Sequence, residues 1–237
     1  MIFYNSPLKI EFDDDGLKVE GKKHPHSIRM LSDINETLMD KLEIKEDKPI
    51  YIMYREVYKK SDLRFDITVI ASRTLGKEYA RTYGHYHPIA EGKLSYPEVY
   101  QVLFGDARFI LQRPNSGNTT DVLVVSAKDG DVILIPPNYG HVTINVSEDK
   151  PLFLSNLVAD TFESDYSEYK KNKGPALYYT VNDLIQNTNY VVKNSNRVTA
   201  SELNKKYNFE CKDLLNDLYY NERKFDFLMK PSLLFKH

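Results

Sequence analysis

The chain has 237 residues, and its 32 basic and 34 acidic side chains leave a net charge of −2. This balance excludes the strongly basic surface of an electrostatic nucleic-acid binder, so we expect no nucleic-acid partner. With 41% hydrophobic residues, the length suits one all-β domain with appended segments. The single cysteine, Cys211, excludes an intrachain disulfide, fits a cytoplasmic protein, and is expected to be a half-buried structural thiol. No signal-peptide pattern opens the chain, and no window of ~18 apolar residues predicts a membrane partner.

The first 48 residues carry strand and turn signals and then one short helix. Residues 8–12 alternate between apolar and charged side chains, residues 13–16 predict a turn, and residues 17–21 can return as the hairpin partner. Ser32 and Asp33, followed by apolar residues at helical spacing, predict a capped short helix. We expect residues 1–48 to pack, as N-terminal strands and a short helix, on the barrel that follows.

From residue 49 the pattern changes to short β-rich runs separated by turn residues. Such a series, with few helical periods, favours an antiparallel barrel or sandwich. We therefore expect residues 49–180 to form an all-β barrel that contains the functional site. The eight predicted strands are 50–57, 63–72, 98–103, 107–113, 120–125, 132–135, 141–146 and 152–158.

The last part of the chain, 181–237, loses the barrel pattern and is expected to be a loop followed by a helical extension. Residues 182–196 carry five asparagines and predict loop or edge structure. A helical tail is expected from Thr199, with one apolar face that ends before Pro231. The residues of that face are Leu214, Leu218, Phe225 and Leu228.

Two of the six histidines stand in the tetrapeptide 84–87, Gly-His-Tyr-His. On a strand, residues i and i+2 point to the same face, so the imidazoles of His85 and His87 are expected to share one space. An isolated pair of this kind is common without a metal. Glu98 and His141 change that weighting, because paired strands can bring both beside the histidines. Three imidazoles and one carboxylate suit Fe(II), Mn(II), Ni(II) or Zn(II) and leave coordination positions open.

The spacing around these residues resembles the two signature motifs of the cupin superfamily. Glu98 is followed after six residues by a glycine, and His141 stands five residues after Pro136 and is followed after three residues by Asn145. The chain departs from the motifs in three places without removing a ligand. Gly76 stands too far upstream, the gap from the histidine pair to Glu98 is long, and Asn138 replaces a glycine. The resemblance implies a single cupin, a jelly-roll type antiparallel β-barrel.

A more specific resemblance is to the archaeal-type, cupin phosphoglucose isomerases. It implies an aldose–ketose isomerase that interconverts glucose 6-phosphate and fructose 6-phosphate, in glycolysis and gluconeogenesis, as a cytoplasmic homodimer. It also implies one divalent transition metal per subunit, Fe2+ first and Mn2+, Ni2+ or Zn2+ as alternatives. The segments that carry it are 62–69, 76–79, 82–88, 96–103 and 135–145, within a likeness running from about 29 to 170.

The same resemblance implies roles for individual residues. His85, His87, Glu98 and His141 would hold the metal, and Tyr51, Thr68, Thr82 and Gly84 would hold the phosphate. Tyr96, Tyr100 and Tyr166 would contact the sugar. Glu98 is the expected proton shuttle through an enediolate, with a hydride shift as the rival. Ser164 stands where the family places a histidine near the sugar.

Two other functions remain open on sequence alone. The same donor set serves a cupin dioxygenase that uses Fe(II) and oxygen, although threonines expected to face a phosphate argue against it. The second is a non-catalytic sugar-phosphate-binding cupin with a structural metal. The complete ligand set argues against it, whereas Ser164, in place of the family's histidine, leaves room for it.

Overall fold

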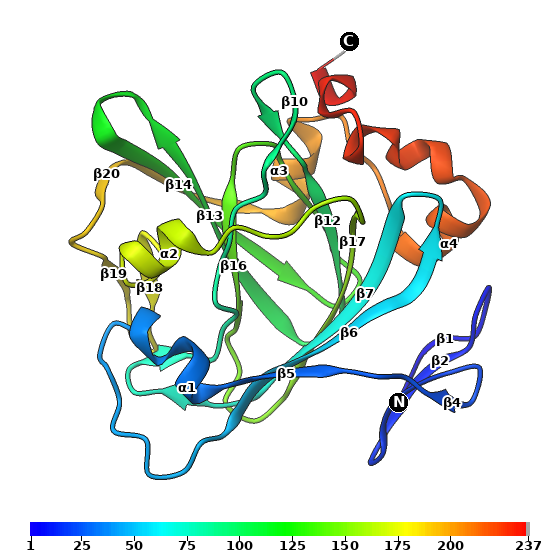
Figure 1. Cartoon of the computed structure of the whole chain (residues 1–237), viewed down its shortest axis with the longest axis horizontal. Coiled ribbons are helices and arrows are strands. Elements are labelled where there is room, and N and C mark those ends of the chain that lie inside the picture. The colour runs from blue at the N-terminus through cyan, green and yellow to red at the C-terminus, as the bar shows by residue number, and fades with distance from the viewer. Residues whose placement is uncertain (236–237) are drawn as a thin grey trace.

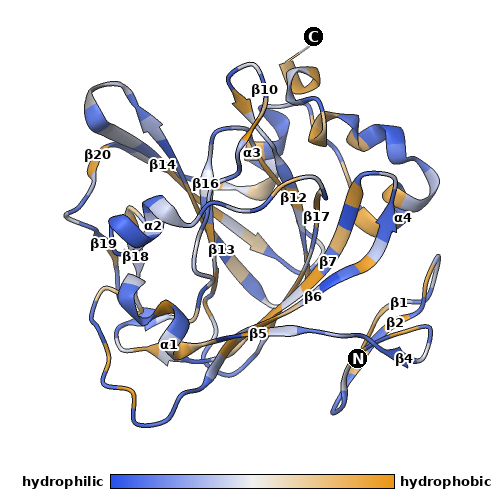
Figure 2. Cartoon of the chain, viewed as in Figure 1, coloured by the Kyte–Doolittle hydropathy of each residue, from blue (hydrophilic) through white to orange (hydrophobic). Residues whose placement is uncertain are grey.

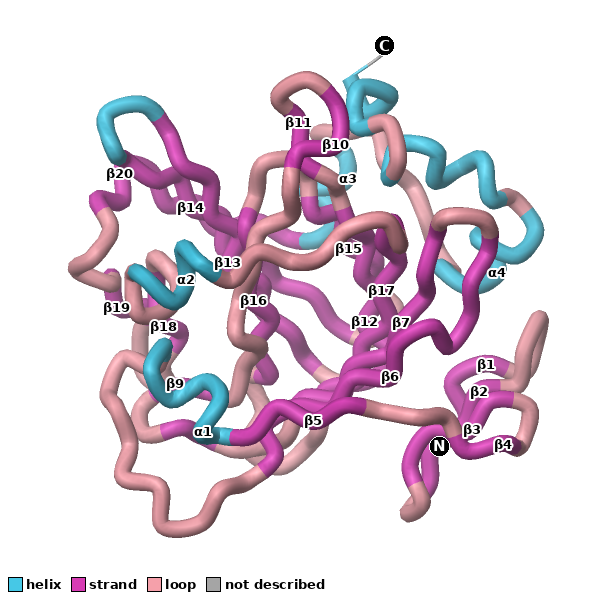
Figure 3. The backbone as a smooth tube through the Cα atoms, in the orientation of Figure 1, coloured by secondary structure: helices cyan, strands magenta, loops and turns pink. Residues whose placement is uncertain are grey.

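The computed structural model describes residues 1–235 and consists mainly of strands, with short helices at the periphery (Figure 1; Figure 3). The last two residues of the predicted C-terminal extension lie outside the described residues. Among residues 1–235, no helix is long and apolar enough to cross a membrane.

Two sheets face each other and form the body of the molecule. The first has the strand order β15-β12-β17-β7-β6-β5, and the second has the order β16-β13-β14-β20. The chain passes from one sheet to the other between β12 and β13, β14 and β15, and β16 and β17, which confirms the predicted jelly-roll cupin fold. Their bounds are β5 (Ser27–Met30), β6 (Pro49–Lys60), β7 (Leu63–Ile70), β12 (Glu98–Phe104), β13 (Asp106–Asn115), β14 (Thr119–Lys128), β15 (Val132–Ile135), β16 (Gly140–Asn145), β17 (Leu152–Ala159) and β20 (Val191–Thr199).

The central strands of the first sheet are buried on both faces, and β17 is buried along its whole length, whereas the edge strand β5 is exposed or half-buried. On β7, the alternation of side chains sends Thr68 and Ile70 toward the second sheet and Phe65, Ile67 and Val69 to the outer face. One core therefore fills the space between the sheets, and a second covers the outer face of the first sheet. Figure 2 shows the hydrophobic residues following the central strands, whereas the β13–β14 hairpin tip is hydrophilic.

The N-terminal and C-terminal segments supply the cover for that outer face. Phe12 meets Phe153 edge-on at 5.0 Å between ring centroids, and Leu214, Leu218 and Phe225 are fully buried in the same core. Both segments lie on the right of Figure 1. Their bounds are β1 (Ile2–Tyr4), β2 (Ile10–Asp13), β3 (Gly16–Val19), β4 (Lys22–Lys23), α4 (Leu214–Tyr220), η3 (Glu222–Leu228) and η4 (Pro231–Phe235).

The structure corrects two helix predictions. The tail is not one helix: α3 (Ala200–Lys205) is separated from α4, and Pro231 begins the 3-10 helix η4 instead of ending the structure, since proline is tolerated in a first helical turn. The short N-terminal helix starts earlier than expected, with α1 (Leu31–Ile34) and η1 (Asn35–Thr37). Ser32 does not cap it, because its hydroxyl donates to Asp47.

Short paired segments complete the fold, and one edge pairing was not anticipated. β20, in the asparagine-rich region, pairs with β14 in parallel, whereas the other pairings of both sheets are antiparallel. The remaining elements are β8 (Thr74–Leu75), β9 (Glu78–Tyr79), β10 (Ile89–Glu91), β11 (Leu94–Ser95), η2 (Ser116–Asn118), α2 (Ser167–Lys171), β18 (Leu177–Tyr179) and β19 (Leu184–Gln186).

Candidate active site

Four side chains from three parts of the chain converge between the sheets. His85 and His87 lie in an extended segment that is joined to β16 by isolated bridges. In one of them the His141 amide donates to the His85 carbonyl at 3.0 Å. His141 belongs to β16, and Glu98 is the first residue of β12. One donor atom from each of the four lies within 4.8 Å of the others. The sequence-predicted ligand residues are therefore brought together.

The donor atoms are arranged around a common point. The Nε2 atoms of His85 and His87 are 3.0 Å apart, and Glu98 Oε2 lies 3.2 Å from His141 Nε2 and 3.5 Å from His87 Nε2. His87 Nδ1 is 2.9 Å from the backbone carbonyl of Tyr96, so it carries the proton and leaves the Nε2 lone pair facing the other ligands. Asn156 donates to Glu98 Oε1 at 2.8 Å, whereas the buried Oε2 has no hydrogen-bond partner.

The electrostatics prepare these groups to bind a cation. Burial lowers the pKa of His87 to about 4, against a smaller opposing effect of Glu98. Burial and the neighbouring imidazoles of His141 and His87 lower the pKa of His85 well below its usual range. Burial by itself would raise the pKa of Glu98, but the contacts with His141 and His87 outweigh it and lower that pKa. Near neutral pH these groups therefore have the protonation states that a metal requires.

The residues fit a divalent transition metal. A buried carboxylate oxygen without a partner is unfavourable unless something positive or a donor reaches it. Here that oxygen faces three imidazole Nε2 atoms, and a mixed N/O donor set of this kind suits Fe(II), Mn(II), Ni(II) or Zn(II).

A cavity of about 470 Å³ lies beside these donors. Ser164 also lines it. Tyr96 does not belong to its described lining; the Tyr96 ring stacks on Phe162 at 4.5 Å between centroids, so its position does not support a direct sugar contact. The predicted substrate residues that line the cavity are Tyr51, Thr68, Thr82, Gly84, Tyr100 and Tyr166.

Only glycine fits at position 84. Its φ is +90°, and an added Cβ would lie 2.4 Å from the Tyr169 ring and 2.6 Å from Val142. Next to it, Thr82 Oγ1 accepts from the Thr143 amide at 3.0 Å and so keeps its hydroxyl proton to donate elsewhere. Backbone and hydroxyl donors are thus available at this end of the cavity.

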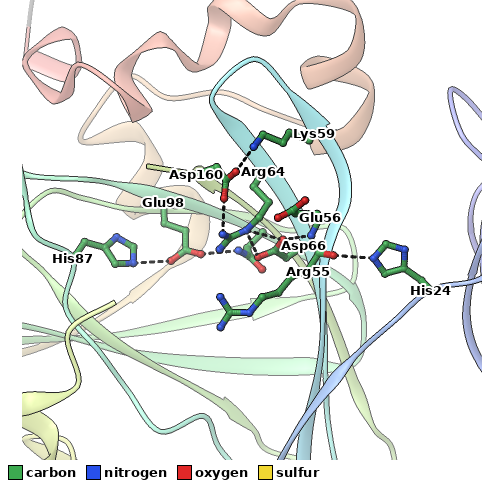
Figure 4. A network of polar contacts seen from close by, with 10 residues as sticks. His24, Arg55, Glu56, Lys59, Arg64, Asp66, His87, Glu98 and Asp160 are labelled. Carbon is green, nitrogen blue, oxygen red and sulfur yellow. Dashed lines mark hydrogen bonds and ion pairs between the residues drawn. The ribbon is translucent and has the colours of Figure 1, made fainter. Parts of the chain in front are cut away.

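Several charged residues of the cavity were not predicted from the sequence. Arg29, Arg55, Arg64 and Asp66 all line it. Figure 4 shows Arg64 between Asp66 and Asp160, which accept from it at 3.0 and 2.8 Å. Arg64 and Asp66 could have been predicted from the sequence. They stand four and two residues before Thr68, and every second side chain of a strand points to the same face, so all three face the cavity.

The family model and the curated relatives agree on one family. The family model described as glucose-6-phosphate isomerase matches residues 31–197. The glucose-6-phosphate isomerase of Pyrococcus furiosus is 33% identical over 164 residues, which cover 66% of this chain and 82% of that protein. That of Thermococcus onnurineus is 30% identical over 174 residues, covering 71% and 86%. Among solved structures, a cupin-2 domain protein from Shewanella frigidimarina aligns at 13% identity with a TM-score of 0.29, covering 44% of this chain and 76% of that one.

Proposed function

The chain belongs to the cupin-type glucose-6-phosphate isomerase family, and we propose from this that it interconverts glucose 6-phosphate and fructose 6-phosphate through an enediolate, with one divalent metal ion. The observation that supports the chemistry best is Glu98 Oε2, a buried carboxylate oxygen without a hydrogen-bond partner beside three imidazoles at the edge of the cavity.

Isomerisation requires a proton to leave C2 of the open-chain sugar and to return at C1. Glu98 takes that proton and returns it, because its lowered pKa keeps it ionised and its Oε2 has no hydrogen-bond partner among the described residues. Asn156 orients the carboxylate by holding the other oxygen. Tyr100, whose hydroxyl lies 3.2 Å from His141 Nε2, stays protonated because burial and Glu98 raise its pKa well above its usual range. It can therefore donate to a sugar oxygen.

His85, His87, Glu98 and His141 would hold the metal. When bound there, a divalent cation supplies Lewis-acid stabilisation of the negative charge that develops on the oxygens of C1 and C2. Among the metals that the donor set accepts, we propose Fe2+ on the family resemblance, with Mn2+, Ni2+ and Zn2+ as alternatives.

The phosphate would occupy the opposite end of the cavity. Tyr51, Thr68 and Thr82 offer hydroxyl groups, and Gly84, whose missing Cβ leaves room for Tyr169 and Val142, lines the cavity beside them. Tyr166 lines the same cavity and is placed to contact the sugar.

The test is a coupled assay with fructose 6-phosphate on purified protein, before chelation, after it, and after refilling with each of the four metals. We expect chelation to abolish turnover and at least one metal to restore it. Turnover that persists in fully metal-free protein would refute metal dependence. No turnover with any metal, together with oxygen consumption, would favour the cupin dioxygenase, and sugar-phosphate binding without turnover would favour the binding module.

We also propose, on the family resemblance, a cytoplasmic homodimer. A mass measurement on the native protein in solution tests the dimer, and a value equal to one 27.6 kDa chain would refute it.

A further inference from the structure

The cavity contains three arginines that differ in how their charge is balanced. Arg64 is paired with Asp66 and Asp160 at 3.0 and 2.8 Å. Among the described residues, no carboxylate lies within ion-pair distance of Arg29 or Arg55. A partly buried guanidinium without a carboxylate partner, lining a cavity, is a candidate binding group for an anion.

Arg29 lies at the end of the cavity assigned to the phosphate. It is on β5, directly across from Tyr51 on β6, and both line the cavity. Its guanidinium carbon is 5.7 Å from the centroid of the Tyr166 ring, which holds the side chain against an aromatic face. The nearest acidic neighbour that influences it, Asp33, is exposed and accepts from the Met30 amide.

Arg55 has a different position. It belongs to an irregular part of β6, where the register with β7 shifts between Tyr54 and Tyr58 and Glu56 has a φ of 55°. Its side chain is exposed, and its charge acts on His85 in the metal cluster instead of on Tyr51. Figure 4 shows its guanidinium apart from the ion pairs of Arg64. Arg55 therefore lines the same cavity and carries the same charge as Arg29, but it lies away from the end assigned to the phosphate.

A phosphate monoester carries close to two negative charges at neutral pH. The hydroxyls of Tyr51, Thr68 and Thr82 can donate hydrogen bonds to it but cannot neutralise it. Arg64 offers an anion less net charge, because Asp66 and Asp160 already pair with it. A planar guanidinium at the hydroxyl-rich end supplies both the charge and two parallel donors.

We propose that Arg29 binds the phosphate dianion of the substrate and makes the cavity selective for phosphorylated over unphosphorylated sugars. This inference rests on the proposed function for the identity of the substrate, but it assigns a residue and a selectivity that the function does not require. Arg29 is a binding residue here and takes no part in proton transfer.

The experiment compares Arg29→Gln, Arg29→Lys and, as a matched loss of one pocket charge, Arg55→Gln. We expect Arg29→Gln to raise KM for fructose 6-phosphate by roughly 10- to 100-fold with kcat changed only a few-fold, the range for losing a charge-assisted hydrogen bond. Turnover of fructose, which carries no phosphate, should be the same in wild type and Arg29→Gln. Arg29→Lys should recover part of the loss, and Arg55→Gln should change KM by less than about 3-fold.

A binding measurement separates this inference from the proposed function. Calorimetric titration with sorbitol 6-phosphate, which cannot be isomerised, should show binding by the wild type and Arg55→Gln and a loss of at least about 10-fold in Arg29→Gln. Binding of this kind in a protein without isomerase turnover would leave Arg29 assigned and refute the function. Isomerase turnover with equal KM in wild type and Arg29→Gln would refute the role of Arg29 alone.

A chemical-modification experiment on the wild-type protein tests the proposal even if Arg29→Gln does not fold. Phenylglyoxal labelling mapped by mass spectrometry should show that inorganic phosphate shields Arg29 and leaves Arg55 reactive. Equal labelling of Arg29 with and without phosphate, or shielding of Arg55 instead, would overturn the proposal.

Discussion

The proposed function gives Glu98 two roles that a single substitution can separate. One of its carboxylate oxygens is held by Asn156, and the other faces His87 and His141. The first contact orients the side chain, and the second places the charge where both a cation and a sugar proton can reach it. In the proposed function, a metal ligand and a proton shuttle therefore share one side chain.

Replacing Glu98 with Gln keeps the shape and one coordinating oxygen but removes the basicity. We expect turnover to fall by about 100-fold or more, as is usual for losing a general base. Metal content should fall less, because three imidazoles remain, whereas His141→Ala should lower metal content and turnover together. Metal analysis and the coupled assay measure both. A fully metallated Glu98→Gln enzyme with nearly normal turnover would leave Glu98 as a ligand only.

The route of the hydrogen can be followed by isotope. If Glu98 carries the proton through an enediolate, the wild type should incorporate solvent deuterium at C2 of glucose 6-phosphate, because a carboxyl proton exchanges with water. NMR of the product formed in D2O measures this. Product without deuterium would support a direct hydride shift between the carbons.

His87 makes the stability of the metal-free protein depend on pH. Its pKa is about 4 in the folded chain, against ~6.5 in an unfolded one. As the pH falls below ~6.5, the unfolded chain takes up a proton that folded His87 does not, so stability falls with pH until about pH 4. His87 alone should contribute a loss of about 2 kcal/mol between about pH 7.5 and about pH 5.

Urea denaturation of metal-stripped protein at these two pH values measures that loss. His87→Gln should reduce the pH dependence, and His26→Gln, which removes an exposed histidine, should leave it unchanged. An equal pH dependence in wild type and His87→Gln would contradict the assignment.

A buried ion pair fixes the segment that leads into the site. Arg81, fully buried, donates to Glu78 at 3.0 Å and to the Thr37 carbonyl, while the Met39 amide donates to Glu78 at 2.6 Å. These contacts tie the end of η1 to β9 and to the residues just before Thr82. The position of Thr82, Gly84 and His85 therefore depends on a segment more than forty residues earlier in the chain.

Glu78→Gln leaves the buried charge of Arg81 without its counterion. We expect a loss of about 3–5 kcal/mol in the free energy of unfolding, the range for breaking a buried pair from one side. Glu11→Gln provides the control, because its pair with Lys9, at 2.8 Å, is solvent-exposed and should matter by less than ~1 kcal/mol. Urea denaturation measures both variants, and equal losses would show that burial of the pair is not decisive.

At the scale of the whole molecule, α4 and η3 of the C-terminal tail lie on the face of the first sheet that points away from the cavity. The family-model match ends at residue 197, and the tail that follows brings α4 and η3 onto apolar residues of β7, β12 and β17. The tail thus completes a second core without contacting the metal cluster. Its contribution should be to stability and not to chemistry.

Phe225→Ala tests this separation. Phe225 is fully buried in the second core, so the substitution should lower the free energy of unfolding by about 3–5 kcal/mol. Metal content and turnover per folded molecule should stay within about 2-fold, because the site lies on the other face of the sheet. Tyr220→Ala, at a side chain that is 71% exposed, should leave stability nearly unchanged. A loss of metal from Phe225→Ala at full folding would contradict the separation.

Local sequence determined the strands, the ligand residues and the family. Alternation along 63–70 and 98–104 is a property of neighbouring residues, and so is the spacing of His85 and His87, which is why eight strands and the four clustered donors could be predicted. Local spacing also predicted the short N-terminal helix and the helical tail, but it missed that the first begins at Leu31 and that the second is divided into separate segments. Helical spacing is shared by segments too short to hold one continuous helix, where packing sets the ends.

Only the tertiary structure decided which distant side chains share the cavity. Arg29 meets Tyr51 through the β5–β6 register and Tyr166 through the return of the chain after β17, and β20 pairs in parallel with β14. A period-2 pattern says which side chains share a face but not which strands become neighbours. That choice is made by the packing of the central strands of the first sheet, which are buried on both faces, and it brings residues far apart in sequence around the four clustered donors and the cavity that contains Arg29.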